Sequence, residues 1–168
     1  MRRALLSLLL FATAGCGVGG PASVTVPADS VAGEAPFRLA GPGGAMLLVS
    51  VEVNGQGPYD LVLDTGATLT CFDQTVADEL QLPRAVGAVG YGAGVGTAGP
   101  MRLVRVDSLR LGAAHAERLT ACVLDLQHLQ QLRTFTGGAT EVHGLLGLNF
   151  LRNYRVTLDF ERNVVALY

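Results

Sequence analysis

The sequence contains no lysine and no tryptophan, and it has few aromatic or charged residues. All twelve basic residues are arginines scattered along the chain, and with fourteen acidic residues the formal net charge is −2. Because nucleic-acid-binding proteins normally present a clustered basic surface, this distribution argues against a nucleic-acid partner. His115, His128 and His143 lack metal-ligand spacing and are interpreted as solvated or turn residues. We therefore predict neither a metal nor another cofactor.

The apolar run near the N-terminus is short. It extends from Ala4 to Ala14 behind two arginines, whereas a membrane-spanning helix needs roughly 20 residues. A basic start, a short apolar centre and small residues are typical of a secretory signal. The segment ends in Thr-Ala-Gly-Cys16, which resembles the lipobox of bacterial lipoproteins except that Thr13 replaces the usual aliphatic residue. We expect residues 1–16 to be a signal peptide with Cys16 lipidated; an ordinary cleaved signal peptide and an uncleaved anchor are the alternatives.

Residues 17–44 are rich in Gly, Ala, Pro and Ser, and we predict that they form a flexible tether. The folded domain is predicted over residues 45–168. A lipid on Cys16 would hold the protein outside the cytoplasm, in the cell envelope, on a bacterial membrane. An oxidising compartment would permit a disulfide between Cys71 and Cys122, and two buried free thiols are the alternative.

The region 45–168 combines many glycines with short apolar runs, which indicates strands and turns rather than long helices. Residues 46–53 are predicted to pair with residues 59–63 across a turn cluster. Asp73 fits the N-cap of a short helix that ends near Leu80. The sequence therefore predicts an all-β domain with one or two short helices. The second helix is expected at 148–153, and further strands at 101–106, 108–111, 119–126, 154–160 and 164–168.

Asp64 interrupts an otherwise apolar strand. Since burying an unpaired carboxylate is costly, an aspartate between Leu61-Val62-Leu63 and Thr65-Gly66-Ala67 is expected on a tight turn at a strand end. Gly66 would give the backbone an unusual φ and let its N–H face the carboxylate. Thr65 would hydrogen-bond to a neighbouring segment. A surface turn is the alternative, but the apolar strands on both sides favour a functional aspartate.

A second motif, Leu145-Leu146-Gly147, precedes the helix predicted at 148–153. The order of an apolar-apolar-Asp-Thr-Gly-Ala motif, a glycine-rich stretch and an apolar-apolar-Gly motif resembles the retropepsin-like aspartic proteases, including bacterial secreted members. The resemblance covers residues 46–168. It implies a closed-barrel half-domain of the pepsin type, with Asp64 as the catalytic carboxylate.

The resemblance also implies a mechanism. In this family two carboxylates hold one water and share a proton; one accepts a proton from the water while the other polarises the scissile carbonyl. Asp125 and Asp159 lack a following Thr/Ser-Gly and are interpreted as strand-end or turn residues. The second carboxylate must therefore come from another copy, and a homodimer would place two Asp64 residues across its two-fold axis. The family's use of chain-terminal strands makes residues 164–168 a candidate interface.

The glycine-rich stretch 87–99 is the predicted flap, with Gly90, Tyr91 and Gly92 at its centre, and it would close over an extended peptide. Tyr91 either points into the cleft or belongs to a mobile surface loop. The stretch also matches G-x-G-x-x-G, but a strand-like run follows where the dinucleotide motif requires a helix. We predict an aspartic endopeptidase that acts on a peptide or protein substrate. The alternative is a catalytically silent module that binds peptides or partners on the same fold.

Overall fold

The computed structural model describes residues 33–85, 90–94, 97–125 and 141–168, with the backbone alone for the described residues between 86 and 100. Within these ranges no helix is long and apolar enough to cross a membrane. The expected signal peptide, the lipidation site Cys16, the first part of the predicted tether and His128 lie outside the described residues.

Short strands make up most of the described chain, and the helices are few, which confirms the all-β prediction. The helices are α1 (Gln74–Glu79), α4 (Leu148–Leu151) and the 3-10 turn η1 (Pro42–Gly44). The strands are β1 (Gly33–Ala40), β2 (Met46–Val53), β3 (Gln56–Leu63), β4 (Cys71–Asp73), β5 (Gly90–Gly94), β6 (Thr97–Leu111), β7 (Ala114–Leu124), β8 (Gly144–Leu146), β9 (Val156–Asp159) and β10 (Val164–Leu167).

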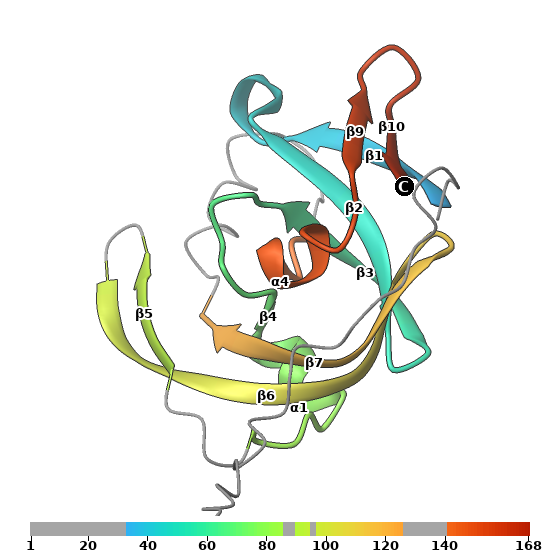
Figure 1. Ribbon diagram of the computed structural model, residues 1–168. Coiled ribbons are helices and arrows are strands. Elements are labelled where there is room, and N and C mark those ends of the chain that lie inside the picture. Colours follow the sequence, from blue (N-terminus) through green and yellow to red (C-terminus); the bar gives the residue numbers. More distant parts are fainter. Residues whose placement is uncertain (1–32, 86–89, 95–96, 126–140) are drawn as a thin grey trace, which may run out of the picture.

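A ring of strands closes into a barrel. The order is β6-β7-β4-β8-β3-β2, and pairing of β2 with β6 completes the ring. In the closing contact Val53 lies opposite Leu109. β6 is one long strand that includes both segments predicted at 101–106 and 108–111, and it curves around the barrel in Figure 1. Because closure pairs the strand edges within the ring, the barrel is a stable support for loops that leave it.

The barrel interior is filled by alternation along the strands. In β2, Val49, Val51 and Val53 are buried, while Ser50 and Glu52 between them are exposed. Successive side chains of a strand point to opposite faces, so this pattern places a row of valines in the core. Other strands and α4 contribute side chains that are almost completely buried: Leu61, Phe72, Leu109, Leu111, Leu146, Phe150 and Leu167.

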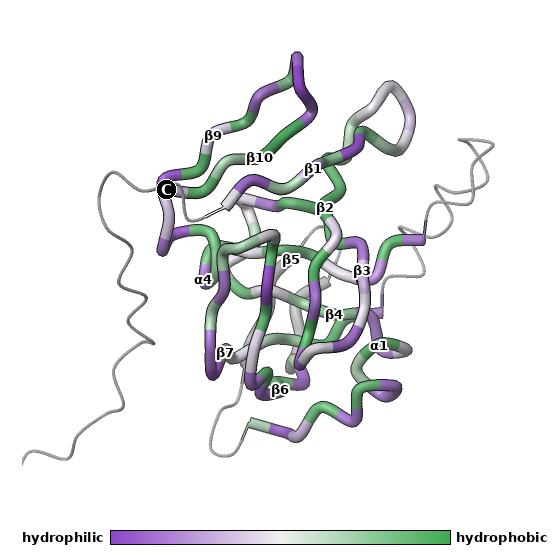
Figure 2. The backbone as a smooth tube through the Cα atoms, turned by 90° about the vertical axis from the view of Figure 1, so that its right-hand side faces the viewer, coloured by the Kyte–Doolittle hydropathy of each residue, from purple (hydrophilic) through white to green (hydrophobic). Residues whose placement is uncertain are grey.

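The strands β1, β10 and β9 continue the sheet beyond β2. Residues 33–36 of β1 pair with β10, and residues 37–40 pair with β2. The tether predicted over 17–44 is therefore wrong for residues 33–44. Alternation of buried Ala35 and Phe37 with exposed neighbours marks a half-buried strand, but its partner β10 lies at the far end of the sequence. Figures 1 and 2 show these strands together at one end of the molecule.

β10 lies between β1 and β9, so both of its edges are paired. The edges of β10 are therefore not free to pair with a strand of a second copy, and the prediction that residues 164–168 belong to a protomer interface stays a prediction. β9 is the outermost strand of this end of the sheet in the described chain.

The predicted helices are both present. Asp73 caps α1, because its carboxylate accepts a hydrogen bond from the Thr75 N–H at 3.0 Å. Leu80 is the C-cap residue, so the end of the helix agrees with the prediction. α4 is shorter than predicted and leads into Tyr154, whose hydroxyl donates to the His115 carbonyl at 2.7 Å. Burial raises the pKa of Tyr154. This contact fixes the segment between α4 and β9 to the barrel.

Candidate active site

Asp64 lies directly after β3, where the chain leaves the barrel. Its N–H donates to the Leu146 carbonyl at 3.0 Å, and its carbonyl accepts from the Ala67 N–H at 3.3 Å. The Gly66 N–H donates to Asp64 Oδ1 at 2.8 Å. The backbone thus holds a half-exposed carboxylate on a tight turn. The predicted position of Asp64 at a strand end, with the Gly66 N–H facing it, is confirmed.

One detail of the predicted turn is wrong, and a second finds no counterpart among the described residues. Gly66 does not adopt a positive φ; a Cβ at this position would lie 3.1 Å from Asp64 Oδ1, so any larger residue would crowd the carboxylate. The Thr65 side chain is exposed and makes no hydrogen bond to another described residue. The neighbouring segment expected to bind Thr65 is therefore absent from the described part of a single chain.

The second motif lies against the first. β8 runs parallel to β3, with Leu145 opposite Val62 and Leu146 opposite Leu63. Gly147 follows β8, and a Cβ there would overlap the Leu69 backbone and approach the Thr70 nitrogen to 2.8 Å. Only glycine allows the end of β8 to pack this closely against the loop that follows Asp64. The sequence motif is thus the close partner of the Asp64 turn.

α4 is hydrogen-bonded to the Asp64 loop by its first residues. The Leu148 N–H donates to the Ala67 carbonyl at 2.8 Å, and the Asn149 N–H donates to the Thr68 carbonyl at 3.1 Å. The loop therefore cannot move without disturbing the start of the helix.

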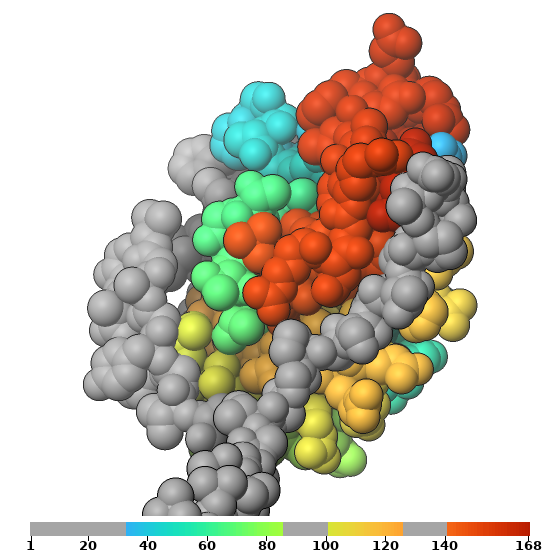
Figure 3. Space-filling model, viewed as in Figure 1, coloured from blue at the N-terminus to red at the C-terminus, as the bar shows by residue number. Residues whose placement is uncertain are grey.

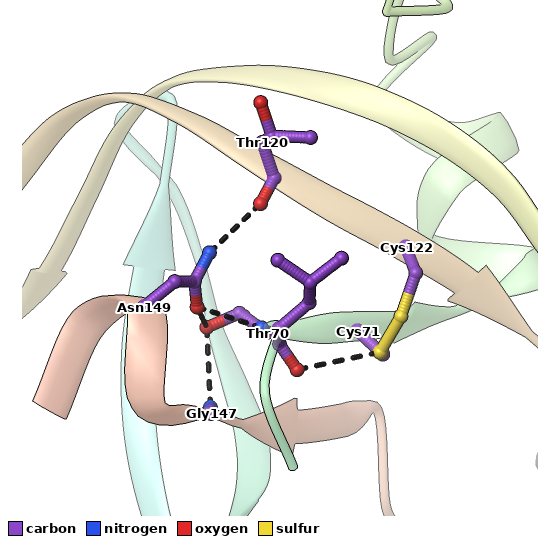
Figure 4. Close-up of a disulfide and its surroundings, with 7 residues drawn as sticks. Thr70, Cys71, Thr120, Cys122, Gly147 and Asn149 are labelled. Carbon is purple, nitrogen blue, oxygen red and sulfur yellow. Dashed lines mark hydrogen bonds between the residues drawn. A yellow bond between two sulfur atoms is a disulfide. The ribbon is translucent and has the colours of Figure 1, made fainter. Parts of the chain in front are cut away.

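A hydrogen-bond network around the buried Thr70 joins the loop, the second motif and β7 (Figure 4). Asn149 Oδ1 accepts hydrogen bonds from the Thr70 N–H at 2.8 Å and from the Thr70 hydroxyl at 2.9 Å. The same hydroxyl accepts from the Gly147 N–H at 3.2 Å, and Asn149 Nδ2 donates to the Thr120 carbonyl at 2.8 Å. Sequence reasoning missed this network, because Thr70 and Asn149 are far apart in sequence and neither type is diagnostic alone.

Cys71 and Cys122 form a disulfide between β4 and β7, which decides between the two alternatives left open by the sequence. The two residues are directly opposite each other in the parallel pair, with Cα atoms 4.4 Å apart. The Cys122 N–H also donates to the Thr70 carbonyl at 2.9 Å. The disulfide follows the Asp64 loop immediately and fixes its far end to the barrel wall.

His143 has a structural role that the sequence did not reveal. Its Nδ1 accepts a hydrogen bond from the Asp60 N–H at 3.0 Å, while its backbone N–H donates to the Asp60 carbonyl and its carbonyl accepts from the Asp73 N–H, both at 2.8 Å. The imidazole packs edge-on against Tyr59. The interpretation of His143 as a solvated or turn residue is wrong, because it joins β3 to the start of β8.

The glycine-rich stretch predicted to be the flap contains a β-hairpin, while its closing over a substrate stays a prediction. β5 and the first part of β6 form an antiparallel hairpin in which Gly90, Tyr91 and Gly92 lie opposite Met101, Pro100 and Gly99. β5 pairs only with β6 among the described strands, and the hairpin extends away from the barrel in Figure 1. The direction of the Tyr91 side chain lies outside what the structure describes.

The other aspartates differ from Asp64. Asp159 ends β9, and its Oδ1 accepts from the N–H groups of Glu161 and Arg162 at 3.0 and 2.9 Å, which confirms it as a turn residue. Asp125 follows β7 and is exposed. Across the described ranges, no group of His, Cys, Asp and Glu side chains is arranged to hold a metal. Asp64 is the one aspartate in the sequence followed by Thr-Gly.

Comparison with known families agrees with this geometry. Residues 49–150 match a family model described as aspartyl protease. The match begins in β2, includes the Asp64 turn and ends in α4, so it contains both motifs. The chain belongs to the aspartyl protease family. The resemblance to retropepsin-like proteases inferred from the order of the motifs is thereby confirmed.

The fold of this family member is similar to that of a retropepsin-like aspartic protease from Rickettsia conorii, with a TM-score of 0.51 and 15% identity, covering 80% of this chain and 89% of that one. Its sequence is 26% identical over 125 residues to Protein DDI1 homolog 1 of Bos taurus. It is 30% identical over 125 residues to UBA domain-containing protein Mud1 of Schizosaccharomyces pombe. Each alignment covers 73% of this chain but only 28% and 33% of the respective relative. The similarity therefore concerns one part of each of these proteins.

Proposed function

We propose that the protein is an aspartic endopeptidase that becomes active when two copies bring their Asp64 carboxylates together. The observation that carries the proposal is the Asp64 turn, in which a half-exposed carboxylate receives the Gly66 N–H at 2.8 Å and is supported by β8 and α4. Each chain has one such carboxylate, and the chemistry needs two. A symmetric homodimer is the simplest assembly that supplies the second.

The proposed reaction is hydrolysis of a peptide bond by an activated water. Two carboxylates at close distance cannot both carry a charge, so the pair holds one proton. One carboxylate accepts a proton from the water, which attacks the scissile carbonyl carbon, while the other donates its proton to the carbonyl oxygen, giving a tetrahedral diol. The C–N bond then breaks as the first carboxyl group gives its proton to the leaving amine nitrogen and the second takes back a proton from a hydroxyl of the diol, so that a carboxylic acid and an amine leave and the pair again holds one proton. The backbone supports of Asp64 keep the carboxylates oriented through these transfers. The β5–β6 hairpin would cover the bound peptide.

The proposed location is the cell envelope, outside the cytoplasm, with the domain tethered through a lipid on Cys16. The Cys71–Cys122 disulfide supports an oxidising compartment, because structural disulfides rarely persist in a cytoplasm. Polypeptides in that compartment are the proposed substrates. Labelling of the expressed protein with a radioactive fatty acid, compared with a Cys16→Ala variant, tests the anchor; equal labelling of both proteins would exclude it.

The experiment that tests the activity measures cleavage of an unfolded protein at mildly acidic pH. Asp64→Asn is expected to abolish cleavage while leaving the fold intact. Asp107→Asn, which changes an exposed aspartate of β6, is the matched control and is expected to cleave normally. A statine-type peptide should inhibit the parent protein. Unchanged cleavage by Asp64→Asn would exclude the proposed chemistry, and binding without turnover would favour the silent peptide-binding module.

A mixing experiment tests whether one site uses two chains. When the parent protein and Asp64→Asn are mixed in equal amounts and allowed to exchange, about a quarter of the dimers carry two Asp64 residues. Activity should therefore fall to about a quarter of that of the parent at the same total concentration, rather than to the half expected for independent chains. A value of one half would show that each chain acts alone.

A further inference from the structure

The imidazole of His143 lies at one end of the β3–β8 strand pair, and Asp64 lies at the other end. His143 Nδ1 accepts the Asp60 N–H at 3.0 Å, and the His143 backbone N–H donates to the Asp60 carbonyl at 2.8 Å. At the opposite end the Asp64 N–H donates to the Leu146 carbonyl at 3.0 Å. The same two strands therefore connect the histidine ring to the backbone that carries the Asp64 carboxylate.

This connection is short and firmly packed. Only three residue pairs, from Leu61 opposite Gly144 to Leu63 opposite Leu146, separate its two ends. Leu61 and Leu146 have no exposed surface, and closely packed interiors transmit displacements. At the Asp64 end the pair reaches the surface, where Figure 3 shows the green segment that contains the Asp64 loop beside the orange α4. A change in the hydrogen bonds at the His143 end should therefore be felt at Asp64.

The hydrogen bond between the His143 ring and the Asp60 N–H exists only while the ring is neutral. A histidine nitrogen accepts a hydrogen bond when it carries no proton, so the neutral ring carries its proton on Nε2. A second proton would have to bind Nδ1, and two N–H groups would then face each other. Histidine is the side chain whose charge ordinarily changes between about pH 5 and 8. Acidification in this range should therefore break the contact with Asp60.

Glu141 faces the outer nitrogen of the ring. Its Oε2 lies 4.0 Å from His143 Nε2, and its side chain is exposed, so its attraction for a charged ring is modest. On the other side, the Asp60 carboxylate already accepts hydrogen bonds from the Ser50 hydroxyl and the Arg38 guanidinium, both at 2.6 Å. A charged ring can turn toward Glu141, which leaves the Asp60 N–H without its acceptor.

The other polar groups packed against His143 belong to β3 and to the start of α1. The Tyr59 ring meets the imidazole edge-on, with centroids 5.6 Å apart, and its hydroxyl donates to Glu79 at 3.3 Å. Asp73, the N-cap of α1, donates its N–H to the His143 carbonyl at 2.8 Å. Neither contact involves a nitrogen of the ring. Among these neighbours, the Asp60 N–H and the Glu141 carboxylate are thus the groups that respond directly to the charge of the ring.

We propose that His143 is a positioning residue of the Asp64 site, which supports the site through the β3–β8 pair while its ring is neutral and withdraws this support when the ring is protonated. The inference rests on the proposed function, because cleavage is the reaction that the position of Asp64 would serve. Misplacing a catalytic group by about 1 Å can lower a rate by about 100-fold. Partial loss of the support should therefore lower the rate of cleavage several-fold.

His143→Asn tests the proposal because it keeps the acceptor and removes the charge. The side-chain oxygen of asparagine is bonded to Cγ, as Nδ1 is in histidine, and it binds no proton in this pH range. The activity of the parent divided by that of His143→Asn should be close to one at about pH 7 and fall to about a third or less at about pH 5. The ratio cancels the titration of the paired Asp64 carboxylates, which both proteins share.

Two further variants complete the test. His143→Leu removes the acceptor and should lower cleavage at both pH values. His115→Asn, at an exposed histidine of β7, is the matched control and should keep the pH profile of the parent. A ratio of parent to His143→Asn that does not change with pH would overturn the positioning role, and so would normal cleavage by His143→Leu.

A second readout does not depend on cleavage. In NMR spectra of the isotopically labelled full chain, the amide signals of Asp60 and Asp64 should shift together as the His143 ring takes up its proton, and His143→Asn should show neither of these shifts. Such shifts without cleavage of any peptide support the positioning role, in which case the proposed activity fails alone. Cleavage by a protein in which neither amide signal follows the ring would retain the activity and overturn the positioning role.

Discussion

Replacing Asn149 by alanine should destabilise the protein more than the same change at Asn153, which lies just after α4. The Asn149 amide receives both the N–H and the hydroxyl of Thr70 and donates to the Thr120 carbonyl. Thr70 has no exposed surface. In the alanine variant the N–H and the hydroxyl of Thr70 would therefore both lose their acceptor. Water could replace this acceptor only by entering the space left by the Asn149 side chain.

The magnitude follows from the count of orphaned groups. Each buried donor left without a partner costs about 1–3 kcal/mol. Because Asn149 is only half-buried, water can replace part of its amide, which favours the lower half of the range. We expect a loss of about 2–4 kcal/mol in the free energy of unfolding, a large share of the 5–15 kcal/mol typical of a domain. Loosening of α4 should also lower the proposed peptidase activity, because α4 holds the Asp64 loop through the Ala67 and Thr68 carbonyls.

Urea denaturation followed by circular dichroism measures this loss as a lower midpoint at an unchanged slope. Asn153→Ala is the matched control: its amide donates to the carbonyls of Asn149 and Phe150 at the end of the same helix, where water is an adequate substitute, and it should cost about 1 kcal/mol or less. Equal midpoints for the two variants would refute the assignment of the network as the main support of the loop.

Three further predictions concern other supports of the fold. Replacing Cys71 and Cys122 together by alanine should lower the unfolding free energy by about 3–4 kcal/mol, as expected for a closed loop of this length, and a midpoint equal to the parent's in urea denaturation would contradict a disulfide. Gly147→Ala should yield little soluble protein in an expression assay, because its Cβ would overlap backbone of the Asp64 loop; normal yield and midpoint would show that the loop can move aside. The hydrogen bond donated by Arg162 and, to a lesser extent, the charge of Arg162 lower the pKa of Glu34. The ion pair therefore contributes stability above the ordinary glutamate pKa of about 4.3, and this contribution is lost as the pH falls through the lowered pKa of Glu34. Arg162→Gln should therefore be less stable than the parent at neutral pH but not below that lowered pKa, and a difference that persists in acid would contradict the ion-pair explanation.

The sequence predicted the Asp64 turn because the signal there is local. Three apolar residues followed by Asp64-Thr-Gly conflict with a continuous buried strand, and a turn at a strand end is the arrangement that resolves the conflict. The capped helix α1 was predicted for the same reason, since Asp73 and the residues that it caps are neighbours. The apolar motif before Gly147 could be paired with Asp64 only through the family resemblance, because its contact with the loop spans a large part of the chain.

The features that the sequence missed depend on contacts between distant residues. β1 appears as a tether when read alone, since its alternation is short and includes Pro36; it becomes a strand because β10 and β2 both pair with it. His143 acquires its role from Asp60, and Thr70 from Asn149, and each pair joins segments that are separated by most of the domain. No residue type at these positions signals its partner.

The supports around Asp64 are unevenly distributed, and this unevenness bears on how the site works. On the barrel side the loop is held by the end of β8, by α4, by the Asn149 network and by the disulfide. On the other side Thr65 is exposed, and no described side chain donates to the carboxylate, which receives only the Gly66 N–H. The Asp64 loop is therefore rigid on its barrel side, while on the opposite side its carboxylate has few hydrogen-bond partners among the described residues. The chain holds this carboxylate at a fixed position but does not supply all the groups around it. In the proposed dimer, the missing groups would come from the second copy, which faces the carboxylate. The accurate position of each Asp64 carboxylate would then be set within each chain before the two copies associate.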